Sequence, residues 1–380
     1  MSEDKSRWLM LFIAFLASFS FLFSMQAVPP VLPTLMEKYG VSHARASNLT
    51  SFIALPGVFL SILGGGLINK YGIRTIGLIG LLLASGGTLL FALSSSFLGL
   101  EIGRLIVGTG GTLVIVAMPA LLTQWFTQKE MGLAMGIHGL NMPLATIISF
   151  NILGRIDMMY SWQTPLLVAF IICILALSIF MFFAKERYKE RVNFSFSGLR
   201  NRKIWILGFI WATFNMAVIS FLTWSPKIFR NFWGLDPVYS DFLGSILMIG
   251  ALITPLAGHI SDRLRKRRQL IILSALGIAI SFLLIPSLSV EALAPMIILL
   301  GLIAAFVPPL VFALPAEIID IKSIGPSFGV LNACLSIGIF AGPLIIGFIM
   351  DLAYDKMLIF FTMAIFSLTS LLLAVILKAR

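Results

Sequence analysis

Residues 65–74 read GGLINKYGIR, and residues 258–267 read GHISDRLRKR. In both segments a glycine at the end of an apolar run is followed by a short polar acceptor, Asn69 or Asp262, and then by basic residues. The two segments occupy corresponding places in the first and second half of the chain. Internal repeats of this kind are typical of transporter folds. The repeated segment therefore predicts two related halves.

Twelve apolar runs surround these segments, and each is about 20 residues long, the length of a membrane-spanning helix. They cover residues 8–30, 46–68, 75–95, 98–124, 130–153, 163–184, 204–226, 240–261, 269–288, 292–315, 325–349 and 357–377. Hydrophobic residues make up 59% of the chain and charged residues 11%, with a mean hydropathy of +1.03. We therefore expect an all-α polytopic membrane protein with twelve transmembrane helices in two pseudo-symmetric six-helix halves. The composition excludes a water-soluble globule, a disordered chain and a disulfide scaffold.

The longest polar break, residues 185–203, separates the two halves. It predicts an N-terminal half over 1–184, a basic cytoplasmic linker over 185–203 and a C-terminal half over 204–380. The net charge of +11 would suggest nucleic acid in a soluble protein. In a membrane chain, basic residues instead mark topology and contact anionic lipid. We expect a lipid bilayer and a small-molecule substrate as partners, no nucleic acid, and a monomer.

The distribution of basic residues predicts the orientation. If both termini are cytoplasmic, 20 of the 27 Lys and Arg residues fall on the inner side and six on the outer side. Lys227 and Arg230 are among the six, and Arg104 lies inside the fourth helix. An inner excess of this size indicates cytoplasmic termini. We expect an integral protein of the cell inner or plasma membrane whose first helix is not cleaved.

Further motifs resemble those of the major facilitator superfamily. The segments 65–74 and 258–267 resemble its loop signature, glycine-x-leucine-x-aspartate-arginine-x-glycine-x-basic. Residues 104–110, RLIVGTG, resemble its arginine–glycine motif, and residues 338–343, GIFAGP, resemble its glycine–proline motif. Residues 119–126, PALLTQWF, are similar to the nitrate, cyanate and lysosomal-dipeptide porter branches. The resemblance implies a secondary transporter that works by alternating access.

The same resemblance implies a cytoplasmic gate, in which the loop aspartate docks at the cytoplasmic start of the eleventh helix or, in the other half, of the fifth helix. The gate residues are Asn69, Lys70, Arg74, Asp262 and Arg263. Asn69 departs from the pattern because it replaces the aspartate and brings no charge to the helix dipole. We therefore expect Asp262 to hold this gate more strongly than Asn69, by docking near Gly325.

Arg104 lies about seven residues into the fourth helix, and a charge at that depth is a functional hypothesis by default. The structural alternative is neutralisation by Glu101, one turn earlier. Helices 1, 4, 7 and 10 line the cavity in the resembling family. The expected substrate-cavity residues are Gln26, Arg104, Thr112, Asn141, Trp211, Asn215 and Asn332. Hydrogen bonding between helices is the alternative role for the neutral groups.

All sixteen carboxylates fall in predicted loops or at helix ends, so none is expected near the bilayer midplane. Coupling ions usually need such a group, and we therefore expect facilitated diffusion or exchange. Glu101 or His138 could instead serve a proton-coupled symporter. A non-transporting receptor or scaffold on the same fold is the alternative from another class.

The sequence contains no complete enzyme motif. The segment 325–329, GPSFG, matches a serine hydrolase pattern, but all three histidines precede Ser327. No H-E-x-x-H or P-loop sequence occurs. The two cysteines lie far apart, within apolar runs. We expect no enzyme activity, no metal site and no cofactor.

Two features of the helices themselves are predicted. Proline runs at 29–33 and 308–315 should interrupt the first and tenth helices, at a binding site or hinge. Small residues such as Gly132 and Gly136 suggest faces for close helix packing.

Overall fold

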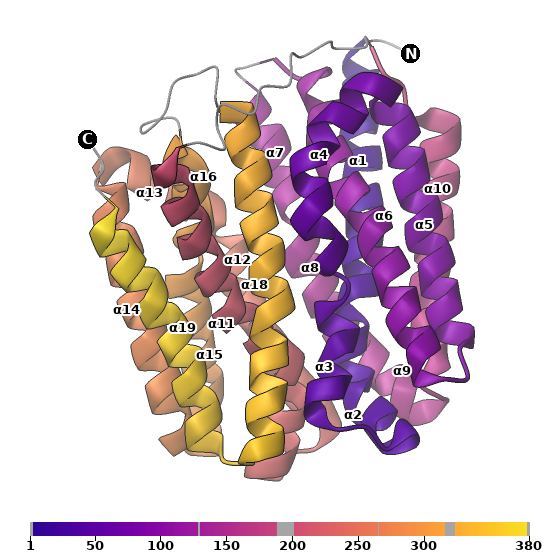
Figure 1. Cartoon of the computed structure of the whole chain (residues 1–380). Helices are drawn as coiled ribbons and strands as arrows, with labels where there is room; N and C mark the ends of the chain where they lie inside the picture. Colours follow the sequence, from indigo (N-terminus) through magenta and orange to yellow (C-terminus); the bar gives the residue numbers. More distant parts are fainter. Residues whose placement is uncertain (1–2, 128–129, 188–200, 265, 316–323, 378–380) are drawn as a thin grey trace. The chain divides into compact units, whose positions relative to one another are not determined.

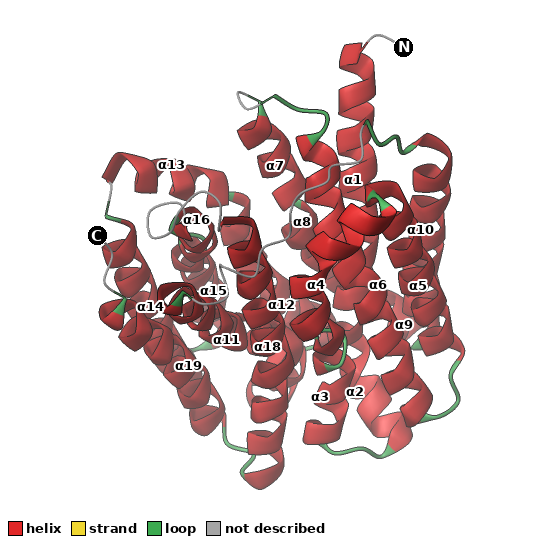
Figure 2. Ribbon diagram, turned by 45° about the horizontal axis from the view of Figure 1, so that its top comes forward, coloured by secondary structure: helices red, strands yellow, loops and turns green. Residues whose placement is uncertain are grey.

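The computed structural model describes residues 3–127, 130–187, 201–264, 266–315 and 324–377, except the side chains of 3–5, 262 and 324–326. Within these ranges the regular elements are all helical, and short loops connect them (Figures 1 and 2). Twelve helical stretches are long and apolar enough to cross a membrane. The expected all-α architecture with twelve spans is therefore confirmed.

Several spans consist of more than one helix. The first six spans are built from α1 (Glu3–Gln26), α2 (Val28–Tyr39), α3 (His43–Ser51), α4 (Leu55–Tyr71), α5 (Ile73–Leu93), α6 (Phe97–Thr123), α7 (Met131–Gly139), α8 (Asn141–Ile148), a π-helical turn (Ser149–Leu153), α9 (Gly154–Met159) and α10 (Gln163–Phe183). The last six are built from α11 (Arg202–Trp233), α12 (Pro237–Leu252), α13 (Thr254–Leu264), α14 (Arg267–Leu284), a 3₁₀ turn (Ile285–Ser287), α15 (Val290–Ala304), α16 (Val307–Ala313), α18 (Ile324–Leu352) and α19 (Lys356–Ile376).

Helix ends are satisfied locally by short polar side chains. The Ser96 hydroxyl accepts from the N–H of Gly99 at the start of α6, and the Asp355 carboxylate accepts from the N–H of Leu358 at the start of α19. At the other end of α11, Gly234 adopts φ = 65°, a left-handed conformation that glycine tolerates best. These caps supply partners for backbone groups that a helix end leaves open.

Within the described ranges five spans are broken, and each break lies shortly before a proline. The interruptions fall at residues 27, 52–54, 140, 253 and 305–306, and the prolines are Pro29, Pro56, Pro143, Pro255 and Pro308. A proline cannot donate the i→i−4 hydrogen bond, and its ring clashes with the preceding turn. The breaks expected in the first and tenth spans are confirmed. Those in the second, fifth and eighth spans were not foreseen.

The helices pack into two compact units. The first consists of Met1–Val31 and Phe52–Phe194, and the second of Leu32–Ser51 and Ser195–Arg380. In the first unit α5 packs on α6 and α10, and α1 packs on α6, α8 and α10. In the second, α11 packs on α12, α18 and α19, and α14 packs on α19. The short helix α3 packs on α18, so the segment that precedes α4 in sequence belongs to the second unit.

Glycines set the closest helix approaches. A Cβ on Gly110 of α6 would strike the Gly80 carbonyl of α5, and a Cβ on Gly250 of α12 would strike the backbone of Gly301 on α15. Close packing was also expected at Gly132 and Gly136, and this expectation is wrong. A Cβ at either position would meet no atom within 4 Å. The buried side of α7 is instead formed by Ala134 and His138.

Some helices extend further than the apolar runs. The first span continues through α2 to Tyr39, and α11 continues to Trp233. Lys227 and Arg230 therefore lie inside α11, which corrects their expected place in an outer connecting segment. Arg230 can lie there because its guanidinium donates to the buried Asp241 carboxylate of α12 at 2.7 Å.

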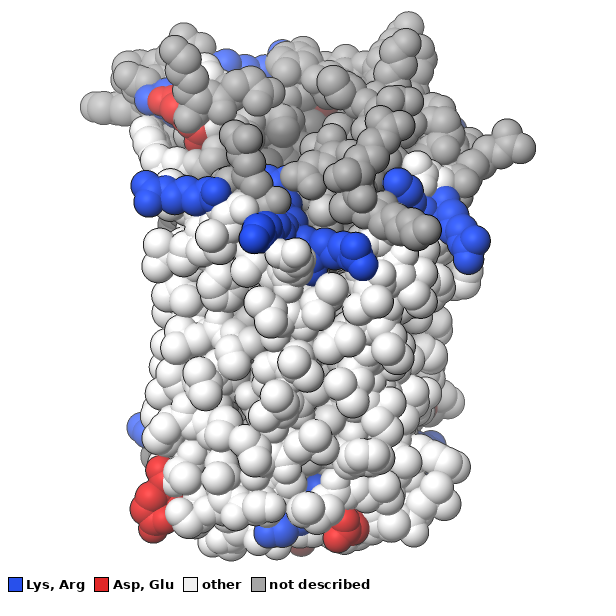
Figure 3. Space-filling view, turned by 90° about the vertical axis from the view of Figure 1, so that its left-hand side faces the viewer, with Lys and Arg blue, Asp and Glu red and all other residues white. Residues whose placement is uncertain are grey.

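Charged side chains keep to the ends of the helices on the face that Figure 3 shows, viewed from the side of α14 and α19. Lys and Arg gather in a band near the end where the C-terminus lies in Figure 1. A few acids and bases occur at the opposite end, and the middle carries neither. An uncharged belt between charged ends is what the hydrocarbon core of a bilayer requires.

Candidate substrate-binding and gating groups

Arg104 is fully enclosed in the first unit, with 2% of its surface exposed. Its guanidinium donates to the main-chain carbonyls of Ser24 and Met25, at 3.1 Å each, and lies 5.7 Å from the centre of the Phe91 ring. Arg104 therefore bridges the third turn of α6 to the last turn of α1. The Glu101 carboxylate, expected as its neutralising partner, is also buried.

The position of Arg104 follows from the break in the first span. The carbonyls in the last turn of a helix have no partner within that helix. The Met25 carbonyl would pair with the N–H of residue 29 in a continuous helix, but Pro29 has none. Arg104 supplies the donor that the Met25 carbonyl lacks, and its positive charge suits the negative end of the α1 dipole.

Polar side chains of α7 and α8 line the same part of α1. The Gln26 amide donates to the Thr146 hydroxyl at 2.7 Å, and the Ser149 hydroxyl donates to the Phe23 carbonyl at 3.4 Å. The His138 ring approaches the Ser18 hydroxyl with its edge, and Nε2 lies 3.5 Å from the oxygen. The Nδ1 atom of His138 is buried and has no hydrogen-bond partner. The structure thus brings Gln26 and His138 to one polar side of α1.

The other expected cavity residues of this unit have more local environments. The Thr112 hydroxyl donates to the Gly108 carbonyl of its own helix at 2.8 Å. Asn141 is buried and begins α8 just after the break at residue 140. It therefore lies where the fifth span turns from α7 to α8, three residues after His138.

In the second unit an aromatic cluster surrounds Trp211 of α11. The indole stacks on Phe214 with ring centroids 5.3 Å apart and meets Phe312 of α16 edge-on at 5.6 Å. Phe312 in turn stacks on Phe328 of α18 at 6.0 Å. The Trp211 residue is 6% exposed, and its Nε1–H is buried without a partner. An N–H of this kind is available to a bound molecule.

Asn215 and Asn332 differ in how they relate to this cluster. The Asn215 amide donates to the Trp211 carbonyl one turn earlier, at 2.8 Å. Asn332 lies one turn beyond Phe328 on α18 and is half-buried. Phe312 and Phe328 were not singled out from the sequence, because an apolar aromatic in an apolar helix gives no sign of its neighbours.

The structure places the side chains of four of the five residues of the expected cytoplasmic gate. Lys70 lies 5.1 Å from the centre of the Tyr71 ring, and Asn69 is half-buried in the last turn of α4. The Arg74 guanidinium donates to the Met181 carbonyl at the end of α10, at 2.8 Å. Arg263 is exposed near the end of α13. The side chain of Asp262 and the residues before α18 lie outside the described part, so the docking of Asp262 stays a prediction.

A carboxylate that sequence reasoning missed holds the start of α5. Glu186 accepts from the N–H groups of Ile73 and Arg74, at 3.2 and 3.3 Å. Its neighbour Arg187 stacks on the ring of Trp125 at 4.3 Å, and the Trp125 indole donates to the Lys185 carbonyl at 3.0 Å. The start of the expected linker is thus attached to the first unit. Nothing in the sequence indicated this contact, because Glu186 lies more than 110 residues from the start of α5.

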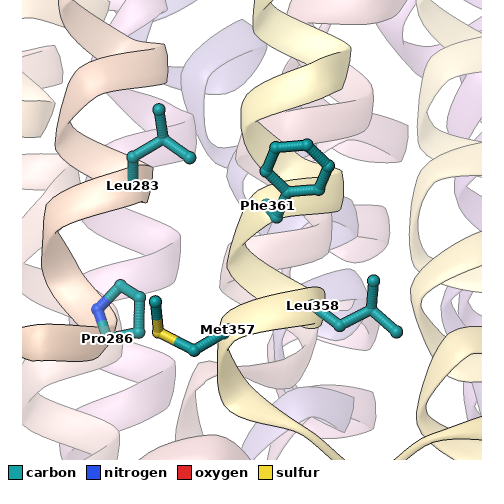
Figure 4. Close-up of a pocket in the computed structure, with 5 residues that line it drawn as sticks. All are labelled: Leu283, Pro286, Met357, Leu358 and Phe361. Atoms are coloured by element: carbon teal, nitrogen blue, oxygen red, sulfur yellow. The ribbon is translucent and has the colours of Figure 1, made fainter.

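One apolar cavity of about 300 Å³ lies between α14 and α19 of the second unit (Figure 4). It is lined by Leu283, Pro286, Met357, Leu358 and Phe361. No polar group lies in that lining to orient a solute, and most of these side chains are exposed on the outside of the helices. The cavity matches a surface that meets lipid tails. Among the described residues no three His, Cys, Asp or Glu side chains gather as metal ligands would.

Twelve apolar spans, with an uncharged belt between charged ends on the face that Figure 3 shows, define an integral membrane protein. The family model described as Major Facilitator Superfamily matches residues 14–320 and 231–380. The chain belongs to the major facilitator superfamily. It is therefore a membrane transporter with a small-molecule substrate rather than an enzyme.

Relatives within this superfamily have varied substrates. A lysosomal dipeptide transporter of Danio rerio is 22% identical over 351 residues, which cover 83% of this chain and 75% of the relative. A probable sulfoacetate transporter of Cupriavidus necator is 22% identical over 351 residues, covering 84% and 81%. A hexuronate transporter of Bacillus subtilis is 19% identical over 378 residues, covering 92% and 89%.

Proposed function

We propose that this transporter carries a small organic solute or anion by alternating access of its two six-helix halves, residues 1–184 and 204–380, in facilitated diffusion or exchange. The basic segment 185–203 is the linker between them. Similar proteins are named for sulfoacetate and hexuronate, which are organic anions, and for dipeptides. Such solutes share hydrogen-bond acceptors, and N–H donors bind them.

The position of the carboxylates supports a mechanism without ion coupling. Glu101 lies in the second turn of α6, Asp241 is paired with Arg230, and every other described carboxylate lies in a loop or near the end of a span. A coupling site usually needs a charged or titratable group deeper in the membrane. His138 lies in the last turn of α7, within the fifth span, and its buried Nδ1 has no hydrogen-bond partner.

The proposed solute-binding groups are Gln26, Arg104, Thr112 and Asn141 in the first unit and Trp211, Asn215 and Asn332 in the second. Trp211 is the most specific of these because a buried donor without a partner costs free energy. A solute that accepts from this N–H recovers that cost, and the Phe312 ring next to it suits the solute's apolar part.

Exchange in proteoliposomes tests the proposal. Vesicles loaded with one unlabelled solute are diluted into the same labelled solute, with sulfoacetate, a hexuronate and a dipeptide tried in turn. Counterflow of one of these solutes without any imposed ion gradient is the expected result. If none of a broad panel of small acids, sugars, peptides and amines moves, the alternative of a receptor or scaffold replaces transport.

A proton-coupled symporter using Glu101 or His138 is the competing mechanism. An imposed pH gradient distinguishes the two, because neither uniport nor solute exchange uses a proton gradient to accumulate solute. Uphill accumulation that disappears in Glu101→Gln or His138→Asn would establish coupling through that residue. Counterflow must survive in the same variant, which shows that the carrier still folds and binds.

The chain is further proposed to lie in the cell inner or plasma membrane as a monomer, with both termini cytoplasmic. The band of Lys and Arg near the end that carries the C-terminus supports this orientation (Figure 3). Protease accessibility of tags at both termini, in sealed right-side-out and inside-out vesicles, measures it. Cleavage of the tags in right-side-out vesicles would show that the termini lie on the outer side.

A further inference from the structure

The start of α3 is held by a carboxylate from a distant part of the chain. Asp351, near the end of α18, accepts from the N–H of His43 through Oδ1 and from the N–H of Ala44 through Oδ2, both at 2.8 Å. The same Oδ1 lies 2.7 Å from Nδ1 of the His43 ring. One carboxylate thus engages three nitrogens of the first turn of α3, whose sequence lacks an acidic residue there.

Aromatic rings fix the His43 side chain in this position. It stacks on Tyr354 with centroids 5.2 Å apart and meets the Trp224 ring of α11 at 5.7 Å. Both neighbours are anchored, since the Trp224 indole donates to the Pro343 carbonyl at 3.0 Å and the Asn231 amide donates to the Tyr354 hydroxyl at 2.6 Å. The imidazole therefore has little freedom to leave the carboxylate.

Charge in this cluster comes from few groups. Burial raises the pKa of Tyr354, so its phenol stays neutral at physiological pH. Lys227 on α11 also acts electrostatically on His43. The Asp351 carboxylate lies at the positive end of the α3 dipole, where a negative charge is stabilising. The attachment thus depends on the charge of Asp351.

Packing below the cluster is tight. A Cβ on Gly347 of α18 would lie 2.7 Å from the His43 carbonyl oxygen and 3.0 Å from the Ser47 hydroxyl oxygen. Only a glycine lets the two helices come so close. The chain then runs from α3 through residues 52–54, where Pro56 breaks the span, into α4 of the first unit. The attached segment therefore ends at a break that can serve as a hinge.

We propose that Asp351 and His43 form an outer latch, which fastens the outer part of the second span to α18 and must release for the outer side of the transporter to open. The inference rests on the proposed alternating access. In the latched state α3 belongs to the second unit; in the released state it moves with α4. Asp351→Asn keeps the shape of the side chain but removes its charge, so it loosens the latch.

Cysteine accessibility measures the latch without any substrate. In a Cys173→Ser, Cys334→Ser background, Ser47→Cys places a thiol of similar size at a position that is buried against α18. Its rate of reaction with a membrane-impermeant maleimide in proteoliposomes reports release. Asp351→Asn should raise that rate roughly three- to tenfold, the scale of a lost charged cap. His43→Gln should raise it less, because both backbone N–H bonds remain.

Asp355→Asn is the matched control. Asp355 lies four residues further on and caps its own helix α19. The same substitution there should leave Ser47→Cys labelling unchanged. Asp351→Glu, which keeps the charge, should restore slow labelling and shows that an effect of Asp351→Asn is not misfolding.

The outcomes separate the latch from the proposed function. If Asp351→Asn labels at the parent rate while the protein still catalyses counterflow, the latch is overturned and transport stands. Equal acceleration by Asp355→Asn, or no rescue by Asp351→Glu, also overturns it. If labelling responds as expected but no solute ever moves, the latch stands and the proposed function fails.

Discussion

The guanidinium of Arg104 donates to the main-chain carbonyl of Met25, 79 residues earlier in the chain, at the point where Pro29 withholds the N–H that a continuous helix would provide. A residue expected to contact solute thus completes a broken helix. Gln26, the next residue, is held on the other side by Thr146. Arg104 therefore positions one of the proposed solute-binding groups through the backbone of α1.

A double-mutant cycle tests this relationship. Arg104→Ala removes the guanidinium donors of the Ser24 and Met25 carbonyls, and each charged hydrogen bond is worth about 1.5–3 kcal/mol. We expect a lower thermal midpoint in detergent and slower counterflow. Pro29→Ala returns an N–H that can pair with Met25. Arg104→Ala should therefore cost less stability in the Pro29→Ala background, and strict additivity would contradict the capping role.

Trp211 and Trp224 form a matched pair for the indole N–H. Trp→Phe removes the same ring atoms at both positions. At Trp224 it also removes the donor to the Pro343 carbonyl, whereas at Trp211 it removes a donor without a partner. Trp224→Phe should lower the free energy of unfolding by about 1 kcal/mol more than Trp211→Phe does. The thermal midpoint should therefore fall further in Trp224→Phe. Trp211→Phe should raise the KM of counterflow; an unchanged KM would remove Trp211 from the binding site.

The Arg230–Asp241 pair should be strongly coupled. Asp241 is 2% exposed, so Asp241→Asn leaves the Arg230 charge poorly compensated. Removing one partner of a buried pair costs about 3–5 kcal/mol. We expect a large fall in the thermal midpoint for Asp241→Asn and partial recovery in Asp241→Asn, Arg230→Gln. If the double variant loses more stability than the two single variants together, the Arg230–Asp241 pair is not the cause of the loss in Asp241→Asn.

Glu186 should stabilise the start of α5. Glu186→Gln keeps two acceptor or donor atoms but loses the charge at the helix N-terminus, which is worth about 0.3–1 kcal/mol at an exposed site. A small fall in thermal midpoint is expected, and it should shrink in high salt. Glu130→Gln, which breaks the Arg7 ion pair near α7, serves for comparison because it leaves α5 untouched. Slower hydrogen exchange at Ile73 and Arg74 in Glu186→Gln would contradict the cap.

We predict that the cytoplasmic gate is asymmetric, because Asp262 holds it more strongly than Asn69 does. Asp262→Asn should shift the population towards inward-open, and Asn69→Asp should favour outward-open. A difference of about 1.4 kcal/mol changes the ratio tenfold, which distance measurements between labelled helix ends detect. If the distance distribution does not move in Asp262→Asn, Asp262 does not hold the inner side closed.

The sequence determined the membrane class, the number of spans and two of the five helix breaks. Apolar runs of about 20 residues have one stable solution in a bilayer, because helices satisfy their own backbone hydrogen bonds. Pro29 and Pro308 break helices by local sterics, which sequence alone shows. The predicted ends were less accurate: Arg230 extends α11 past its apolar run because Asp241 lies beside it.

Tertiary structure alone decided which polar side chains have hydrogen-bond partners within the protein. Thr112 bonds within its own helix, Arg104 is used by α1, and the Trp211 N–H is left open, although all three have similar polar-in-apolar surroundings in the sequence. The contact between His43 and Asp351 spans 308 residues. Hydrogen bonds act over about 3 Å, and the partner of a side chain is therefore set by which helices pack side by side, a property of the whole chain that no local pattern contains.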